Sequence, residues 1–232
     1  MPTQLRVELS SNQSVAALLY AAARQDRAGI TLILGHGAGA GQTSDFMVEF
    51  ADALAARGID IVTFNFVYSE QKRRLPDPNS RLEECYRGVI EAVFKLSEVR
   101  ENRLAIGGKS MGGRIASQVA AAGAGPAAGL VFLGYPLHSP GRPDRLRAEH
   151  LSRIKAPMLF VQGSRDAFGT PDELRPIIER LTARAGLHIV EGGDHSFKVP
   201  RKSGLRQDEV YHQIQDSIAS WLRCTIAERS RK

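Results

Sequence analysis

The chain is poor in cysteine, in long apolar runs and in residue spacings that bind metals. Its two cysteines, Cys85 and Cys224, lie in no CxxC or Cys/His pattern, so we expect buried free thiols in a reducing compartment. No apolar run approaches the roughly 20 residues of a membrane-spanning helix. We therefore expect a cytoplasmic protein with no membrane partner, no metal and no organic cofactor.

Export and nucleic-acid signals are also weak. Residues 15–23, VAALLYAAA, resemble the apolar core of a signal peptide, but the residues before them are polar and uncharged, so a strand is the preferred interpretation. The net charge of +6 and the pI near 9.6 predict a general attraction for anions. The basic residues are spread along the chain, apart from a small cluster at 228–232. We expect no nucleic-acid partner.

From about residue 29, short apolar runs alternate with amphipathic stretches. The predicted strands are 5–10, 15–22, 29–35, 60–66, 103–108, 129–137, 156–163 and 187–193. The predicted helices are 43–58, 81–99, 111–123, 171–186 and 207–228. This order predicts an α/β fold with a mostly parallel central sheet and helices on both faces. We expect one domain over residues 1–232, since no linker or repeat divides the chain; its oligomeric state stays open.

The run RLAIGGKSMGGR at 103–114 has two competing interpretations. A phosphate-binding loop needs a glycine five residues before Gly108, and that position is Arg103. The alternative G-x-S-x-G fits at Gly108, Ser110 and Gly112, between a predicted strand and a predicted helix. That context is typical of the sharp turn that presents a catalytic serine, with packing glycines as the simpler alternative. Ser110 is the predicted nucleophile.

A serine nucleophile needs a base and an acid that orients the base. His195 follows a late predicted strand, and Asp166 follows the strand before it. We predict that both reach Ser110, because the carboxyl ends of parallel strands meet at one edge of the sheet. Asp194 and Glu191 are rival acids, although Asp194 adjoins His195 and would have to distort the loop to reach Nδ1. A surface histidine and a capping aspartate are the simpler alternatives.

The loop GHGAGAGQ at 35–42 has two possible functions. Acyl transfer needs two donors for the oxyanion, and we predict the backbone N–H groups of Met111 and Ala38. The same loop satisfies G-x-G-x-x-[GA], but a dinucleotide site needs an acid after the next strand, where Asn65 stands. His36 is expected to be a hydrogen-bonding loop residue.

With these residues assembled, the chain resembles the α/β-hydrolase superfamily over nearly its full length. More narrowly, GHGAGAG, GGKSMGGR, GLVFLGYPLHSPGRPDRLR, PMLFVQGSRD and GGDHSF resemble the small family that includes testis-expressed protein 30 and the hydrolase-like region of an NSL chromatin-complex subunit. The resemblance implies the triad Ser110, Asp166 and His195. It implies little about the substrate, and it leaves room for a scaffolding role.

Residues 138–153 are too few for a cap domain, so we expect a minimal cap or none over a shallow site. Three loops at the expected rim carry clustered positive charge. The basic residues are Lys72, Arg73 and Arg74; Arg142, Arg145 and Arg147; and Lys198, Arg201 and Lys202. From these, Arg73, Arg74, Arg142, Arg145 and Lys198 are the candidate substrate-binding residues, for anionic substrates. A solvated basic surface is the simpler alternative.

Together these features predict a serine hydrolase that cleaves a small-molecule carboxylic ester or thioester through an acyl-enzyme on Ser110. The opposing hypothesis is a non-catalytic α/β-hydrolase-like interaction module in which the triad is a relic.

Overall fold

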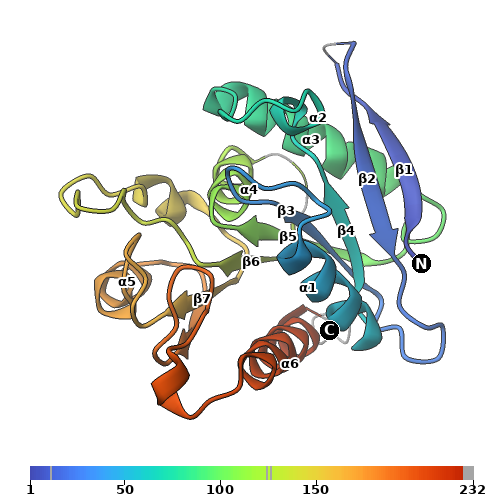
Figure 1. The fold of residues 1–232 in the computed structure, drawn as a ribbon. Helices are drawn as coiled ribbons and strands as arrows, with labels where there is room; N and C mark the ends of the chain where they lie inside the picture. Colours follow the sequence, from blue (N-terminus) through green and yellow to red (C-terminus); the bar gives the residue numbers. More distant parts are fainter. Residues whose placement is uncertain (11, 124, 126, 227–232) are drawn as a thin grey trace.

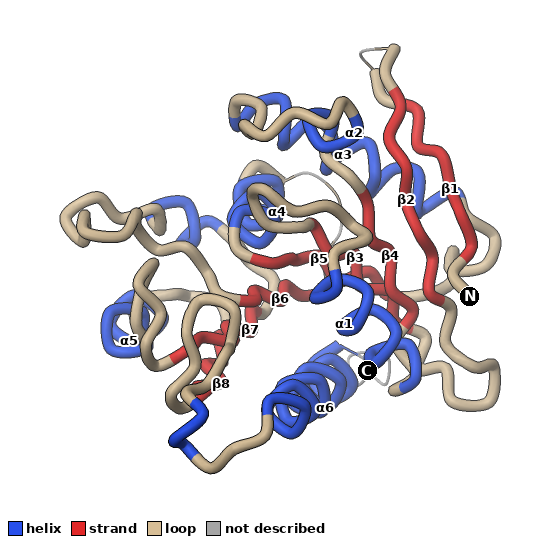
Figure 2. Tube along the Cα trace, in the orientation of Figure 1, coloured by secondary structure: helices blue, strands red, loops and turns tan. Residues whose placement is uncertain are grey.

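The computed structural model describes residues 1–10, 12–123, 125 and 127–226 as one eight-stranded sheet with helices on both faces (Figures 1 and 2). The basic cluster at 228–232 lies outside the described residues. The strands are β1 (Thr3–Glu8), β2 (Ser14–Tyr20), β3 (Ile30–Gly35), β4 (Asp60–Phe64), β5 (Arg103–Lys109), β6 (Gly129–Leu133), β7 (Met158–Gly163) and β8 (Ala185–Val190). Their order is β1-β2-β4-β3-β5-β6-β7-β8. β1 and β2 pair antiparallel, β2 is antiparallel to β4, and the remaining pairs are parallel.

Two helical layers cover the sheet (Figure 1). On one face lie α1 (Asp45–Ala56) and α6 (Gln207–Ile226). On the other lie α2 (Val67–Glu70), α3 (Asn79–Lys95), α4 (Met111–Ala121) and α5 (Pro171–Ile178). Side chains alternate between the two layers along each strand: Leu32 packs toward α1 and α6, and Ile33 toward α3 and α4. All six residues of β3 are buried, as expected for a parallel strand covered on both sides.

Several boundaries differ from the sequence predictions. The helix predicted over 171–186 ends at Ile178, because the chain turns back to pair Ala185 with Met158 in the sheet. The strand predicted over 129–137 ends at Leu133, where Gly134 takes a positive φ of 64°.

The two cysteines also differ in their surroundings. Cys85 is a buried free thiol, as predicted, and burial raises its pKa to about 12. The prediction was wrong for Cys224, which is a free thiol but exposed. The helical period of α6 turns Leu222 and Ile226 inward and places Cys224 on the outer side.

The prediction that no cap domain covers the sheet is confirmed. Residues 134–157, all of them described, contain one short 3-10 helix, η1 (Glu149–Arg153), and otherwise loop. A second 3-10 turn, η2 (Arg201–Ser203), precedes α6. Among the helices in the described part of the chain, none has the length and apolar character needed to span a membrane.

Candidate active site

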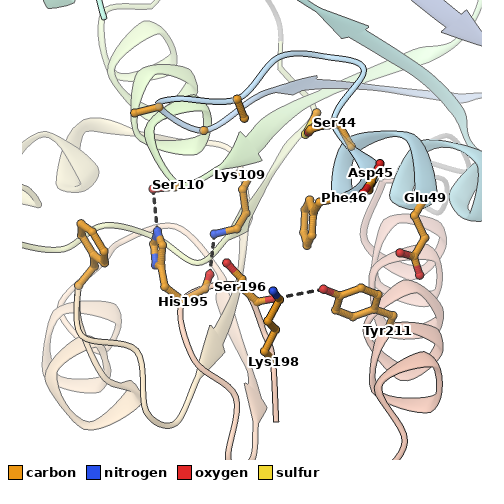
Figure 3. Close-up of a pocket in the computed structure, with 15 residues that line it drawn as sticks. Ser44, Asp45, Phe46, Glu49, Lys109, Ser110, His195, Ser196, Lys198 and Tyr211 are labelled. Carbon is orange, nitrogen blue, oxygen red and sulfur yellow. Dashed lines mark hydrogen bonds between the residues drawn. The ribbon is translucent and has the colours of Figure 1, made fainter. Parts of the chain in front are cut away.

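Three loops at the carboxyl edge of the sheet bring Ser110, Asp166 and His195 together. Ser110 follows β5, Asp166 follows β7 and His195 follows β8. His195 Nε2 lies 2.8 Å from Ser110 Oγ, and Figure 3 marks this hydrogen bond with a dashed line. His195 Nδ1 lies 2.8 Å from Asp166 Oδ2 and 3.0 Å from Oδ1. Because the carboxylate accepts the proton of Nδ1, Nε2 is left as the acceptor for the serine hydroxyl.

The turn at Ser110 holds the serine in a strained backbone conformation. Ser110 has φ 50° and ψ −114° and is the residue directly before α4, a conformation that is rare for residues with side chains. Side chains at the neighbouring glycines would clash with the end of β3. A Cβ at Gly108 would lie 2.3 Å from Gly35 O, and one at Gly112 would lie 2.1 Å from it. The two glycines therefore allow β5 and α4 to approach β3 at this turn.

The loop after β3 passes directly beside the serine. Ala38 and Met111 both line a hollow that also contains Ser110. His36 Nδ1 donates to Gly37 O at 2.8 Å, and Nε2 accepts from the N–H of Phe66 at 3.2 Å. Burial lowers the pKa of His36, in keeping with a neutral ring that shapes the loop.

Asn65, which occupies the position where a dinucleotide site needs an acid, is engaged in the same loop. Its Oδ1 accepts from the N–H of Gln42 at 2.8 Å, and its Nδ2 donates to Glu70 at 2.9 Å. These hydrogen bonds fix the end of the glycine-rich segment 35–42 to the residue that follows β4.

Asp166 is buried, with 1 % of its surface exposed, and both oxygens of its carboxylate accept hydrogen bonds. Oδ1 accepts from the N–H of Phe168 at 2.8 Å, and Oδ2 accepts from Gln162 Nε2 at 2.8 Å. Gln162 also donates to Gly169 O at 2.7 Å and accepts from the N–H of Tyr135 at 2.8 Å. Gln162 was not among the predicted site residues. Its signal in the sequence is a single amide at the end of the otherwise apolar strand MLFVQG.

Lys109, beside the serine, is the second site residue that was not predicted from the sequence. Its side chain lies beside His195, and Figure 3 marks its hydrogen bond to the His195 backbone with a dashed line. Nζ donates to His195 O at 2.6 Å. Nζ also lies 5.9 Å from the ring centre of Phe46 and 5.6 Å from that of Phe197. Burial lowers the pKa of Lys109 to about 8, although the charges of Asp166 and Asp194 act to raise it.

The two rival acids lie elsewhere. Asp194 Oδ1 accepts from the N–H of Ser196 at 2.8 Å and of Lys198 at 2.9 Å, which closes the turn that carries His195. Glu191 is exposed. Among the described acids, Asp166 is the one whose carboxylate is within hydrogen-bonding distance of the His195 ring.

Ser110 lies between two hollows. The larger, about 550 Å³, extends between α1 and α6 and is lined by Phe46, Tyr211 and Lys109 among others. The smaller, about 270 Å³, extends over α4 toward the loop that precedes α3. Ser110, Ala38 and Phe168 line both.

The predicted substrate-binding residues are placed unevenly. Lys198 lines the larger hollow. Arg73 instead pairs with Asp77, Nη2 to Oδ1, at 2.5 Å. Three further candidates are exposed and line neither hollow: Arg74, Arg142 and Arg145. Within the described ranges, no group of three or more His, Cys, Asp or Glu side chains is arranged to hold a metal ion.

Comparisons with known proteins agree with the fold. The model of the alpha/beta hydrolase domain family matches residues 28–223. Dienelactone hydrolase from Anabaena variabilis has a similar structure, with a TM-score of 0.77, 19% identity, and coverage of 97% of this chain and 98% of that one. A lid-less α/β serine hydrolase from Xanthomonas campestris gives 0.73 and 18%, covering 95% and 94%.

A third similar structure is Est1E from Butyrivibrio proteoclasticus with ferulic acid bound, at a TM-score of 0.70 and 13% identity, covering 93% of this chain and 99% of that one. At these identities the structures bear on the fold, whereas the family match spans most of the sequence. The chain therefore belongs to the alpha/beta hydrolase domain family.

Proposed function

We propose that the protein is a serine hydrolase that cleaves a small-molecule carboxylic ester or thioester. The observation that carries this proposal is the continuous hydrogen-bonded series from Ser110 Oγ through the His195 ring to the buried Asp166 carboxylate. Its members come from three separate strand ends, and its order matches that of an activated serine nucleophile. The open edge of the sheet gives a small substrate direct access to Ser110.

In the proposed mechanism, His195 Nε2 takes the Ser110 proton as Oγ attacks the substrate carbonyl. Asp166 holds the proton on Nδ1 and stabilises the imidazolium that forms. The backbone N–H groups of Met111 and Ala38 stabilise the oxyanion. His195 then gives its proton to the departing alcohol or thiol, which leaves an acyl ester on Ser110. Water activated by His195 releases the acid and restores the serine.

The chemistry needs no metal or organic cofactor, because the nucleophile, base and oxyanion donors all belong to the chain. Membership of the smaller family that includes testis-expressed protein 30 is part of this proposal. It rests on the motifs quoted above, and it carries no information about the acyl or leaving group.

The test is covalent labelling by a fluorophosphonate probe, measured by intact mass. We expect one adduct on the wild type, none on Ser110→Ala, and labelling slowed by about 10³-fold or more on His195→Ala. Ser44→Ala is the matched control, because Ser44 lines the same hollow and its side chain does not cap α1.

Hydrolysis of matched short-chain esters and thioesters would then establish the bond that is cleaved. Folded wild-type protein that resists the probe, or an adduct that survives in Ser110→Ala, would contradict the proposal. Resistance of a folded wild type would favour the non-catalytic interaction module.

A further inference from the structure

The smaller hollow beside Ser110 has a different lining from the larger one. It holds about 270 Å³, which is slightly below the roughly 300–1,000 Å³ of pockets that enclose whole ligands. It shares Ser110 and Ala38 with the larger hollow. One end of a substrate can therefore occupy the smaller hollow while the carbonyl of the same molecule lies at Ser110. The smaller hollow is large enough for that end.

Arg114 lines one wall of this hollow. Arg114 lies one turn into α4, and its backbone N–H donates to Ser110 O at 3.0 Å. Its side chain is partly buried, with Nη2 donating to Asn79 Oδ1 at 3.1 Å and Nη1 to Gln118 Oε1 at 3.4 Å. A guanidinium has five N–H donors, so these contacts fix the group and leave donors for a ligand.

A second arginine, Arg147, lines the same hollow from the loop between β6 and β7. The backbone of Arg147 is anchored on both sides: its N–H donates to Leu137 O at 2.7 Å and its carbonyl accepts from Tyr135 Oη at 2.8 Å. Its Nη2 donates to Ser139 Oγ at 2.6 Å. Burial lowers the pKa of Arg114, and the positive charge of Arg147 lowers it further.

The hollow also has one carboxylate in its wall, that of Asp77. Asp77 is 6 % exposed, and its Oδ1 is paired with Arg73 at 2.5 Å and lies 3.7 Å from Arg81 Nη1. Two arginines outside the hollow, Arg73 and Arg81, already face this carboxylate. The negative charge of Glu83 also acts on Arg114, but more weakly than the positive charge of Arg147. An anion between the two guanidiniums would relieve their mutual repulsion and accept several charge-assisted hydrogen bonds.

We propose that the smaller hollow binds a free carboxylate of the substrate, held by Arg114 and Arg147. The preferred substrate is then a half-ester or half-thioester of a short dicarboxylic acid, and the leaving group lies in the larger hollow against Phe46 and Tyr211. The spacing supports a short acid, because four residues of helix separate Arg114 from Ser110 by about 6 Å along the axis. This inference rests on the proposed function of Ser110.

The test compares two substrates that differ in charge alone: the monobenzyl ester of glutaric acid and the benzyl ester of its monoamide. Release of benzyl alcohol gives kcat/KM for each. We expect the wild type to prefer the acid by about tenfold or more, with the preference falling at high salt. Arg114→Gln and Arg147→Gln should each lower kcat/KM for the acid about tenfold and leave the neutral ester within about twofold.

Two further variants locate the effect. Arg145→Gln removes a charge from the same loop but outside the hollow, and Arg175→Gln removes an exposed charge from α5. Neither should change the preference for the acid. Because Arg147 is exposed, Arg147→Gln should fold even where Arg114→Gln does not, and fluorophosphonate labelling verifies that Ser110 is intact in each variant.

Equal rates on the two esters in the wild type would overturn the carboxylate subsite and leave the hydrolase proposal standing. If Arg145→Gln lost as much of the preference as Arg114→Gln and Arg147→Gln, the assignment to this hollow would be overturned. The preference would then come from the overall positive potential around the site. If the wild type neither cleaves the neutral ester nor reacts with the probe, the proposed function fails, and the inference fails with it.

Discussion

The loops that follow β7 and β8 each carry an aspartate near His195, and the two aspartates have opposite surroundings. In residues 164–170, Asp166 is 1 % exposed and reaches across to the ring of His195. In residues 191–199, Asp194 is only partly buried and accepts hydrogen bonds from its own loop. One aspartate, Asp166, thus orients a histidine on a neighbouring loop, whereas the other, Asp194, closes the turn of its own loop.

Their supports differ as well. Gln162 supports the Asp166 loop, because its Nε2 donates to Asp166 Oδ2 and to Gly169 O. Lys109 supports the loop of Asp194, because its Nζ donates to His195 O. Four substitutions test this division of roles, beginning with the one that should have the largest effect.

Asp166→Asn should lower kcat by about 10³- to 10⁴-fold, because an amide can hold His195 in the wrong tautomer and cannot stabilise the imidazolium. The measurements are the steady-state rate of hydrolysis of an ester that the wild type cleaves and the rate of fluorophosphonate labelling. Circular dichroism controls for folding. A loss below about tenfold would remove Asp166 from the proposed triad.

Gln162→Met should lower kcat by up to about 10²-fold with little change in KM, because Asp166 would lose one of its two supports and shift. It should also cost about 1–3 kcal/mol of unfolding free energy for the buried groups left without partners.

The matched control for this substitution is Gln215→Met. Gln215 is fully buried in α6, and its amide has no hydrogen-bond partner among the described residues. The free energy of unfolding should therefore be unchanged or higher. If both substitutions reduced activity equally, the effect would reflect core packing and not the support of Asp166.

Lys109→Met should change how stability depends on pH. The folded protein lowers the pKa of Lys109 to about 8 from its ordinary 10.5, so between these values the unfolded chain binds the extra proton. The wild-type free energy of unfolding should then rise, relative to that of the variant, by up to about 3 kcal/mol from pH 8 to 10.5.

The comparison with the variant is needed because burial raises the pKa of Cys85 to about 12. An acid whose pKa is raised by folding makes both proteins less stable as pH rises over the same range. Urea unfolding of wild type and variant at pH 7 and pH 10 gives the difference. If the difference in unfolding free energy between wild type and variant were the same at both pH values, folding would not lower the pKa of Lys109.

Asp194→Ala should have the smallest effect on chemistry, with kcat changed by less than about threefold, below 1 kcal/mol in the barrier. Loss of the acceptor for the Ser196 and Lys198 N–H groups should cost about 1 kcal/mol of stability. Asp194→Asn keeps an acceptor oxygen and should recover most of that. A loss of kcat in Asp194→Ala as large as in Asp166→Asn would reverse the comparison between the two loops.

Much of the fold could be predicted from local sequence, because a buried parallel strand has a continuous apolar run and a covering helix has a periodic one. The alternation of strands and helices followed from such patterns, and the lack of a cap domain followed from the small number of residues at 138–153. The helix predicted to 186 failed at its end, because pairing of Ala185 with Met158 outweighed the helical pattern of a polar segment.

Candidate site residues were predictable where a local motif marks them. Ser110 lies in G-x-S-x-G, and His195 follows a late strand. Gln162 and Lys109 were missed because a lone polar residue in an apolar run has no motif, and its partners are distant in sequence. The basic loops have the same limitation as a signal, because clustering of charge along the chain does not say where the side chains lie. Arg74, Arg142 and Arg145 are exposed to solvent.

By itself, the sequence determined the strands and helices and the turn that exposes Ser110, since these depend on side-chain periodicity and on glycine at positions that tolerate no Cβ. Only the tertiary structure decided which of three acids meets His195 Nδ1. It also decided that Lys109 Nζ donates to His195 O and that Arg114 and Arg147 line one hollow. Each of these depends on groups far apart in sequence that the sheet edge and its loops bring within a few ångströms, a placement that no local pattern encodes.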